Sequence, residues 1–155
     1  MSRAAARGKL DVVQQLVAAG ANVQAKDRYG ATPLHQAAYA GKPDIVRFLI
    51  EHGSPVDVAD TNGKTPLMEA PFGGNVLAAE VLLAHGANPN IKDKDGKNAL
   101  YWALQGSCSN RDSNPVLALL VKAGADLRFL DTLSAEQRER FQKYLKKSQA
   151  ARTNP

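Results

Sequence analysis

The sequence predicts an all-α repeat fold, in which each unit contributes a turn and two helices. Three observations support this fold class. One pattern recurs every 33 residues, apolar residues within each unit follow helical spacing, and turn, cap and break residues hold the same place in each unit. Because one helix pair cannot bury its own apolar face, roughly three or more units are needed for stability.

Each unit begins with a turn that leads into a helix. Three segments align at the 33-residue step, namely 27–35, 60–68 and 93–101. In the first of them, Asp27 and Gly30 provide turn chemistry, because glycine accepts positive φ. Thr32 is then expected as the helix N-cap, with Pro33 at the first helical position. The pattern therefore predicts a helix from about Pro33.

A second helix is expected in the same unit after a short break. Gly41 and Pro43 interrupt the first helix, and an apolar run follows at 45–50. Gly53 stands where a left-handed C-cap would end this helix. The order is thus turn, helix, loop, helix and then the next turn.

These residues resemble the ankyrin repeat. The resemblance is carried by 30–38, with its Gly-x-Thr-Pro-Leu-His-x-Ala-Ala pattern, and by 45–53, which ends in glycine. It covers roughly residues 3–130, over 80% of the chain. It implies an ankyrin-repeat solenoid of L-shaped units, in which antiparallel helix pairs stack side by side and hairpin β-turns project as "fingers". In this family the histidine at the position of His35 holds neighbouring turns by hydrogen bonds.

The repeats are expected over residues 1–133, followed by a helix that caps the stack. The expected divisions are a partial N-terminal repeat at about 1–26, repeats at 27–59 and 60–92, a fourth at 93–130 with a loop insertion near 107–115, a capping helix at 134–148 and a flexible tail at 149–155. Ser134 and Gln137 form a capping-box pattern at the start of that helix. Pro71 is expected to kink or shorten the first helix of the third repeat.

Composition and charge exclude several classes of protein. No run of 18 apolar residues exists to span a membrane, and no secretory signal is recognisable. The lone Cys108 is typical of a reducing compartment, so we expect a cytoplasmic protein, with the nucleus as the alternative. The net charge is +5, and +4 of this lies in residues 134–155, which hold six basic and two acidic side chains. The nearly neutral body argues against nucleic acid as the partner.

Nothing in the sequence predicts an enzyme, a cofactor or a metal. The three histidines, His35, His52 and His85, are dispersed and have only one cysteine to join them, so no zinc-ligand spacing arises. His52 and His85 each precede a C-capping glycine, where a cation suits the helix dipole. No glycine-rich phosphate loop follows a strand.

The family resemblance places partner contacts on the fingers and on the exposed side of the first helices. The candidate residues that map there are Arg28, Tyr29, Tyr39, Lys64, Phe72, Lys94, Lys97 and Trp102. Exposed aromatic residues are typical interface anchors. The alternative is that some of these rings pack between adjacent repeats. If the finger aspartates are held in turn hydrogen bonds, the lysines should point outward and favour an acidic partner. A merely solvated surface is the alternative.

We therefore expect a monomeric protein–protein interaction module, acting as a scaffold, adaptor or regulatory binder. An inhibitor of a partner enzyme, such as a kinase, is a special case of this expectation. The alternative from another class is a nucleic-acid or anionic-membrane contact through the basic C-terminal helix. The residues that motivate it are Arg138, Arg140, Lys143, Lys146 and Lys147.

Overall fold

The computed structural model describes residues 1–105 and 115–150, and these residues form helices and no strand. The all-α prediction is confirmed. The helices are α1 (Ser2–Ala6), α2 (Leu10–Ala18), α3 (Pro33–Tyr39), α4 (Pro43–Glu51), α5 (Pro66–Glu69), α6 (Val76–Ala84), α7 (Ala99–Gln105), α8 (Pro115–Lys122) and α9 (Ala135–Ala150), with two 3₁₀ helices, η1 (Ala70–Gly73) and η2 (Arg128–Thr132).

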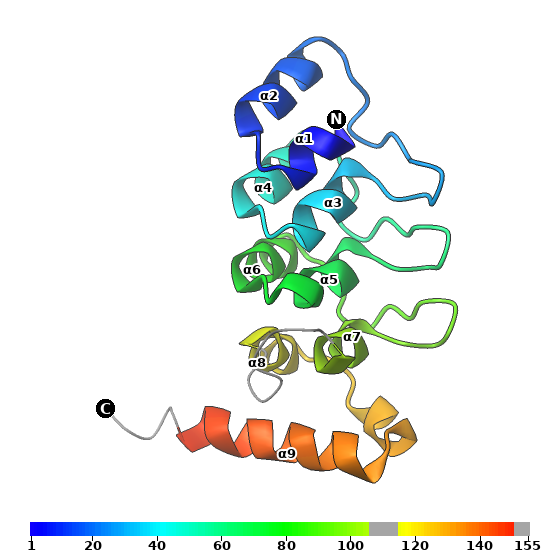
Figure 1. Ribbon diagram of the computed structural model, residues 1–155, viewed down its shortest axis with the longest axis vertical. Helices are drawn as coiled ribbons and strands as arrows, with labels where there is room; N and C mark the ends of the chain where they lie inside the picture. Colours follow the sequence, from blue (N-terminus) through cyan, green and yellow to red (C-terminus); the bar gives the residue numbers. More distant parts are fainter. Residues whose placement is uncertain (106–114, 151–155) are drawn as a thin grey trace.

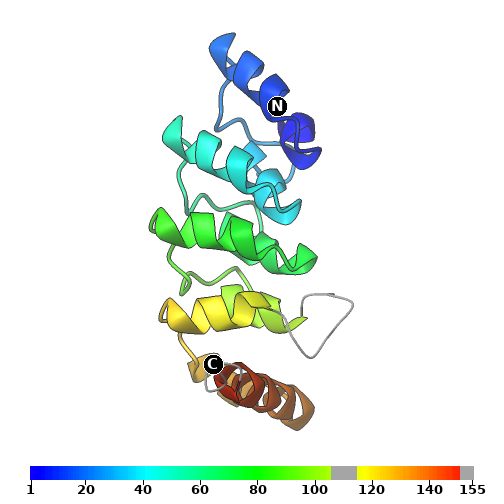
Figure 2. The same cartoon turned by 90° about the vertical axis from the view of Figure 1, so that its left-hand side faces the viewer.

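The helices stack in two rows, with the fingers along one side. Figure 1 shows α1, α3, α5 and α7 in the row next to the three projecting loops, and α9 lying across the end of the stack. The second row, α2, α4, α6 and α8, faces the viewer in Figure 2. Leu34, Leu67 and Leu100 occupy equivalent positions of successive repeats, and each is fully buried. Each repeat therefore covers the apolar face of its neighbour.

The expected cap residues start and end the helices. Thr32 and Thr65 are extended residues at the N-caps of α3 and α5, and proline follows each of them. The helix α4 ends at Glu51 with His52 as its C-cap residue, and Gly53 then has φ +91°. Because that angle is left-handed, glycine is the residue that reverses the chain there with the least strain.

Pro71 shortens the first helix of the third repeat, as predicted. The α-helical part, α5, ends at Glu69, and residues 70–73 continue as the 3₁₀ helix η1. The equivalent helix α3 runs without interruption to Tyr39. Proline lacks the N–H that an α-helix needs at this point, so the chain tightens and Phe72 lies on η1.

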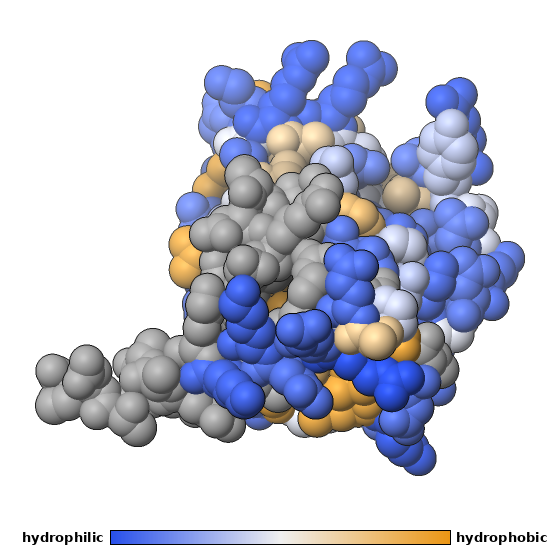
Figure 3. Space-filling view, turned by 60° about the horizontal axis from the view of Figure 1, so that its bottom comes forward, coloured by the Kyte–Doolittle hydropathy of each residue, from blue (hydrophilic) through white to orange (hydrophobic). Residues whose placement is uncertain are grey.

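The C-terminal end of the stack is covered by α9. Phe141 on this helix is buried and belongs to the same apolar core as Leu120 and Ala125. The helix reaches Ala150, two residues beyond its expected end. Viewed from the α9 end, the described surface is largely hydrophilic, with smaller hydrophobic areas (Figure 3). The expected insertion near 107–115 falls almost entirely outside the described residues, and so do positions 151–155 of the expected tail.

Candidate functional site

Each finger is shaped by one aspartate at its start. Oδ1 of Asp27 accepts hydrogen bonds from the backbone N–H groups of Tyr29 (2.8 Å) and Ala31 (3.0 Å). Asp60 and Asp93 make the same pair of bonds to the second and fourth residues after them. The expectation that turn hydrogen bonds hold these carboxylates is confirmed. Their 33-residue series is therefore part of the framework.

Backbone hydrogen bonds join successive fingers. The N–H of Thr61 donates to the carbonyl oxygen of Tyr29 at 2.9 Å, and the N–H of Lys94 donates to that of Asn62 at 2.9 Å. Lys26 strengthens the first junction, because its ammonium donates to the carbonyl oxygen of Ala59 at 3.1 Å. The three fingers, at 27–31, 60–64 and 93–97, therefore form a continuous edge beside the first helices, which we call the finger ledge.

His35 connects the second repeat to the third. Its Nδ1 accepts a hydrogen bond from the N–H of Thr32 at 3.1 Å and lies 3.0 Å from the Thr32 hydroxyl. Its Nε2 lies 3.0 Å from the carbonyl oxygen of Lys64, so Nε2 carries the proton and donates. Burial is the main cause that lowers the pKa of His35. A neutral, fully bonded imidazole suits the structural role that the family resemblance implied.

Four aromatic rings form a continuous row across repeats two to four. The ring centroids are 6.2 Å apart for Tyr39 and Phe72, 5.5 Å for Phe72 and Trp102, and 5.6 Å for Trp102 and Tyr101. We call Tyr39, Phe72, Trp102 and Tyr101 the aromatic row. Tyr39 is 55% exposed, and the other three rings are half-buried. The row therefore both packs between repeats and borders solvent.

Tyr101 is the member of the row that sequence reasoning missed. It stands at the position that His35 holds in the second repeat and Met68 in the third. Both of those side chains are buried, so the alignment suggested an internal position for Tyr101. The one available signal was its aromatic character beside Trp102.

Trp102 is fixed in the row by a hydrogen bond as well as by packing. Its indole N–H donates to Oδ2 of Asp93 at 2.9 Å. Asp93 is nearly buried, and its other oxygen holds the finger turn. The orientation of the Trp102 ring is therefore coupled to the shape of the Asp93 finger.

Lys64 does not point outward, which corrects the expectation for the finger lysines. Its ammonium lies 3.7 Å from the ring centroid of Trp102 and 5.0 Å from that of Phe72. It also pairs with Glu69 at 3.7 Å, and both side chains are less than one-fifth exposed. The negative faces of the two rings attract the cation, so Phe72 of the same repeat and Trp102 of the next repeat hold Lys64 inward.

Lys97 behaves in a related way at the end of the row. Its ammonium lies 5.1 Å from the ring centroid of Tyr101 and 5.4 Å from that of Trp102. It pairs with Asp95 at 3.2 Å, and the hydrogen bond to Asp95 is the main cause that raises its pKa. The cation thus stands at the edge of the row, with part of its charge compensated.

The remaining candidates lie at the finger tips. Tyr29 is 56% exposed, and the guanidinium carbon of Arg28 lies 4.7 Å from its ring centroid. Lys94 is also exposed. These residues belong to the finger ledge, and among the described residues no ring contact links Tyr29 to the aromatic row.

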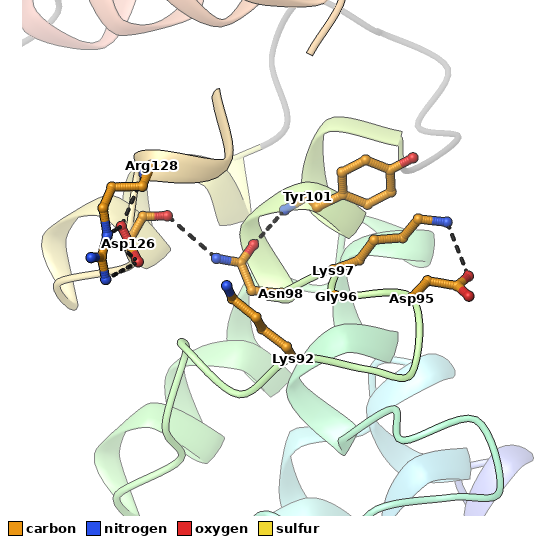
Figure 4. Close-up of a pocket in the computed structure, with 8 residues that line it drawn as sticks. All are labelled: Lys92, Asp95, Gly96, Lys97, Asn98, Tyr101, Asp126 and Arg128. Carbon is orange, nitrogen blue, oxygen red and sulfur yellow. Dashed lines mark hydrogen bonds and ion pairs between the residues drawn. The ribbon is translucent and has the colours of Figure 1, made fainter. Parts of the chain in front are cut away.

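A cavity opens at each end of the aromatic row. The first, of about 250 Å³, is lined by Ala31, His35, Gln36, Tyr39, Asp60 and Glu69. The second, of about 650 Å³, is lined by Lys92, Asp95, Gly96, Lys97, Asn98, Tyr101, Asp126 and Arg128 (Figure 4). We call them the acidic pocket and the basic pocket, after the charges that distinguish them. The row thus runs from one polar recess to another.

One of the basic residues at the start of the C-terminal helix has a structural role. The guanidinium of Arg138 donates to the backbone carbonyl oxygens of Leu133 (3.1 Å) and Asp131 (3.3 Å). It therefore anchors the start of α9. Lys143 and Lys146 are exposed, whereas the side chains of Arg140 and Lys147 lie outside the described part of the structure.

The described residues place no other chemical site beside the row. Within them, no group of three or more His, Cys, Asp or Glu side chains is arranged to hold a metal ion. None of the described helices has the length and apolar character that a membrane crossing needs. Cys108 lies outside the described residues.

Comparison with known proteins agrees with the repeat pattern. A family model described as ankyrin repeats, in three copies, matches residues 1–93. No curated protein matches the chain.

Proposed function

The chain belongs to the ankyrin repeat family, whose members are generally protein–protein interaction modules, and we propose that it binds a partner protein through the aromatic row and the finger ledge. The proposed contact residues are Arg28, Tyr29, Tyr39, Lys64, Phe72, Lys94, Lys97 and Trp102. In this proposal the chain is a monomeric adaptor or regulatory binder of the cytoplasm or nucleus, and inhibition of a partner enzyme is one form of that role.

The observation that carries the proposal is the continuity of the aromatic row. Three repeats contribute to it, and neighbouring centroids are no more than 6.2 Å apart. Aromatic side chains contribute much of the binding energy at protein interfaces, because they bury a large area with few rotatable bonds. Rings that already pack on one another lose little further freedom on binding.

The finger ledge supports the same face. Its backbone is held by the aspartate turns and by the hydrogen bonds between fingers. Arg28, Tyr29 and Lys94 project from it as exposed side chains. A hydrogen-bonded edge that carries exposed polar side chains suits the rim of an interface, where specificity and association rate are set.

The test is alanine substitution in the row, measured against a partner captured from the source cell. Tyr39→Ala and Phe72→Ala should each weaken the complex by about 1–3 kcal/mol. Leu77→Ala is the matched control, because Leu77 is 62% exposed on α6, in the other helix row. Circular dichroism should show unchanged helix content in all three variants. Equal affinity for wild type and both row variants would exclude this face as the binding surface.

A further inference from the structure

The acidic pocket contains a carboxylate whose charge is incompletely compensated. Glu69 is largely buried, and burial is the main cause that raises its pKa, against the lowering effect of Lys64. The Glu69–Lys64 distance of 3.7 Å is long for an ion pair, and Lys64 is shared with two aromatic rings. A second cation in the pocket would stabilise the Glu69 carboxylate.

The other walls of this pocket suit a basic side chain as well. Asp60 also lines the pocket and uses only Oδ1 for the turn. Tyr39 presents an exposed ring at the rim, and an aromatic face attracts an arginine or lysine head group. Gln36 adds an amide to the lining.

The basic pocket has the opposite character. It contains three cations, Lys92, Lys97 and Arg128. Two carboxylates face them, and these are already paired, Asp95 with Lys97 at 3.2 Å and Asp126 with Arg128 at 2.8 Å. Lys92 has no ion-pair partner among the described side chains, although its charge acts on Asp126. Figure 4 shows it with the other residues that line the pocket. An acidic group in this recess would find an ammonium that is not held in an ion pair.

This pocket exists because the Asp93 finger has no following finger. A Cβ atom on Gly30 would lie 2.8 Å from the backbone nitrogen of Thr61 in the next finger, whereas a Cβ on Gly96 would meet nothing within 4 Å. After Asp126 the chain turns into η2. The space that another finger would fill is therefore left open beside Tyr101.

We propose that the aromatic row and its two pockets recognise one extended partner segment with a basic side chain at one end and an acidic side chain at the other. The basic side chain enters the acidic pocket, apolar side chains cover the row, and the acidic side chain enters the basic pocket. Tyr39 and Tyr101, the terminal rings of the row, each form a wall of one pocket. This inference rests on the proposed function and adds the chemistry of the partner.

The spacing of the two charges follows from the architecture. The acidic pocket lies between the second and third repeats and the basic pocket lies beyond the fourth, which is two repeat steps. Packed helices are about 8–10 Å apart, so the pockets are separated by roughly 16–20 Å. An extended chain rises about 3.3 Å per residue, which places the two charged residues about five or six positions apart.

The test begins with a phage-displayed library of random peptides. Binders of the full chain are counter-selected against the Phe72→Ala variant, so that only peptides using the row remain. The proposal expects a basic and an acidic position about five or six residues apart, with apolar residues between them. Row-dependent peptides without this charge pattern would overturn the inference and leave the proposed function standing. A library with no row-dependent peptides would contradict both.

Synthetic peptides then test each pocket separately. The probe carries arginine and glutamate six positions apart on a leucine- and proline-containing spacer, and the fluorescence of Trp102, the single tryptophan, reports binding. Replacing either charged residue of the peptide by glutamine should weaken binding about tenfold. In the Glu69→Gln variant, replacing the peptide arginine by glutamine should no longer weaken binding, whereas replacing the peptide glutamate still should. In the Lys92→Gln variant, the reverse is expected.

A change of specificity provides the strictest control. The Lys92→Glu variant should prefer a peptide with arginine at both charged positions over the arginine–glutamate probe. Equal binding of the arginine–glutamate and glutamine–glutamine peptides would overturn the inference. So would a Glu69→Gln variant that weakens the arginine and glutamine peptides by the same factor.

Discussion

The Nε2–H of His35 donates a hydrogen bond to the carbonyl oxygen of Lys64 at 3.0 Å, and so links two neighbouring repeats. The third repeat has Met68 at the equivalent position and makes no such bond. There the hydroxyl of Thr65, the counterpart of Thr32, is buried without a hydrogen-bond partner among the described residues. The polar network at the start of the first helix is therefore complete in the second repeat and incomplete in the third.

Acidification should destabilise the protein through His35. Burial lowers its pKa below the ordinary value of 6.5, so below about pH 6.5 the unfolded chain binds the proton more readily than the folded one. The contribution is complete above that pH and is lost as the pH falls toward the folded-state pKa. Urea unfolding at pH 7.5 and 5.5 should show a smaller loss in His35→Gln than in wild type. An identical loss in both proteins would contradict the assignment.

Removal of the threonine hydroxyl should affect the two caps differently. Thr32→Val deletes a hydroxyl that lies 3.0 Å from Nδ1 of His35 and should lower the free energy of unfolding by about 1 kcal/mol. Thr65→Val deletes the hydroxyl that has no partner and should leave stability unchanged or slightly raised. Both residues are 1% exposed, so burial is matched, and chemical denaturation measures the difference. Equal costs would show that the His35 network adds nothing.

Introducing histidine into the third repeat should stabilise it. In Met68→His the new imidazole would stand near the Thr65 hydroxyl and the carbonyl oxygen of Lys97, as His35 does near Thr32 and Lys64. We expect a gain of about 1 kcal/mol in the free energy of unfolding at pH 7.5. The gain should disappear when Thr65→Val is added. A gain of the same size in that double variant would mean that packing, and not the hydrogen bonds, was responsible.

Two glycines test the contact between fingers. Gly30 and Gly96 have similar left-handed φ angles, +72° and +78°, so alanine meets the same backbone strain at both, about 1 kcal/mol. Only Gly30→Ala also presses against the backbone of Thr61. Gly30→Ala should therefore be more destabilising by about 1–3 kcal/mol. Thermal unfolding of the two variants provides the comparison, and equal midpoints would contradict close packing of the fingers.

The helices and their ends could be predicted from the sequence because their causes are local. Thr32 and Pro33 begin α3, Gly53 follows the end of α4, and Pro71 removes the donor that α5 needed. Each of these effects acts within about one helical turn. The 33-residue period then placed Leu34, Leu67 and Leu100 at one buried position.

The candidate face was only partly predictable, because the side chains there are positioned by neighbouring repeats. The sequence placed Tyr29, Tyr39, Phe72 and Trp102 on one exposed strip. Among the described residues, Tyr29 makes no ring contact with the other three, and Tyr101 extends the row instead. The sequence also placed Lys64 outward, whereas the rings of Phe72 and Trp102 draw its ammonium inward. The closest of these ring contacts is made with Trp102, which lies 38 positions along the chain in the next repeat.

The sequence by itself determined which segments are helical, where they end and that they stack as repeats, since dihedral preferences, capping and apolar periodicity act over a few residues. The tertiary structure decided which rings touch, which cations are held in ion pairs and where pockets open. Those properties arise from the distances and the desolvation that each repeat imposes on its neighbour.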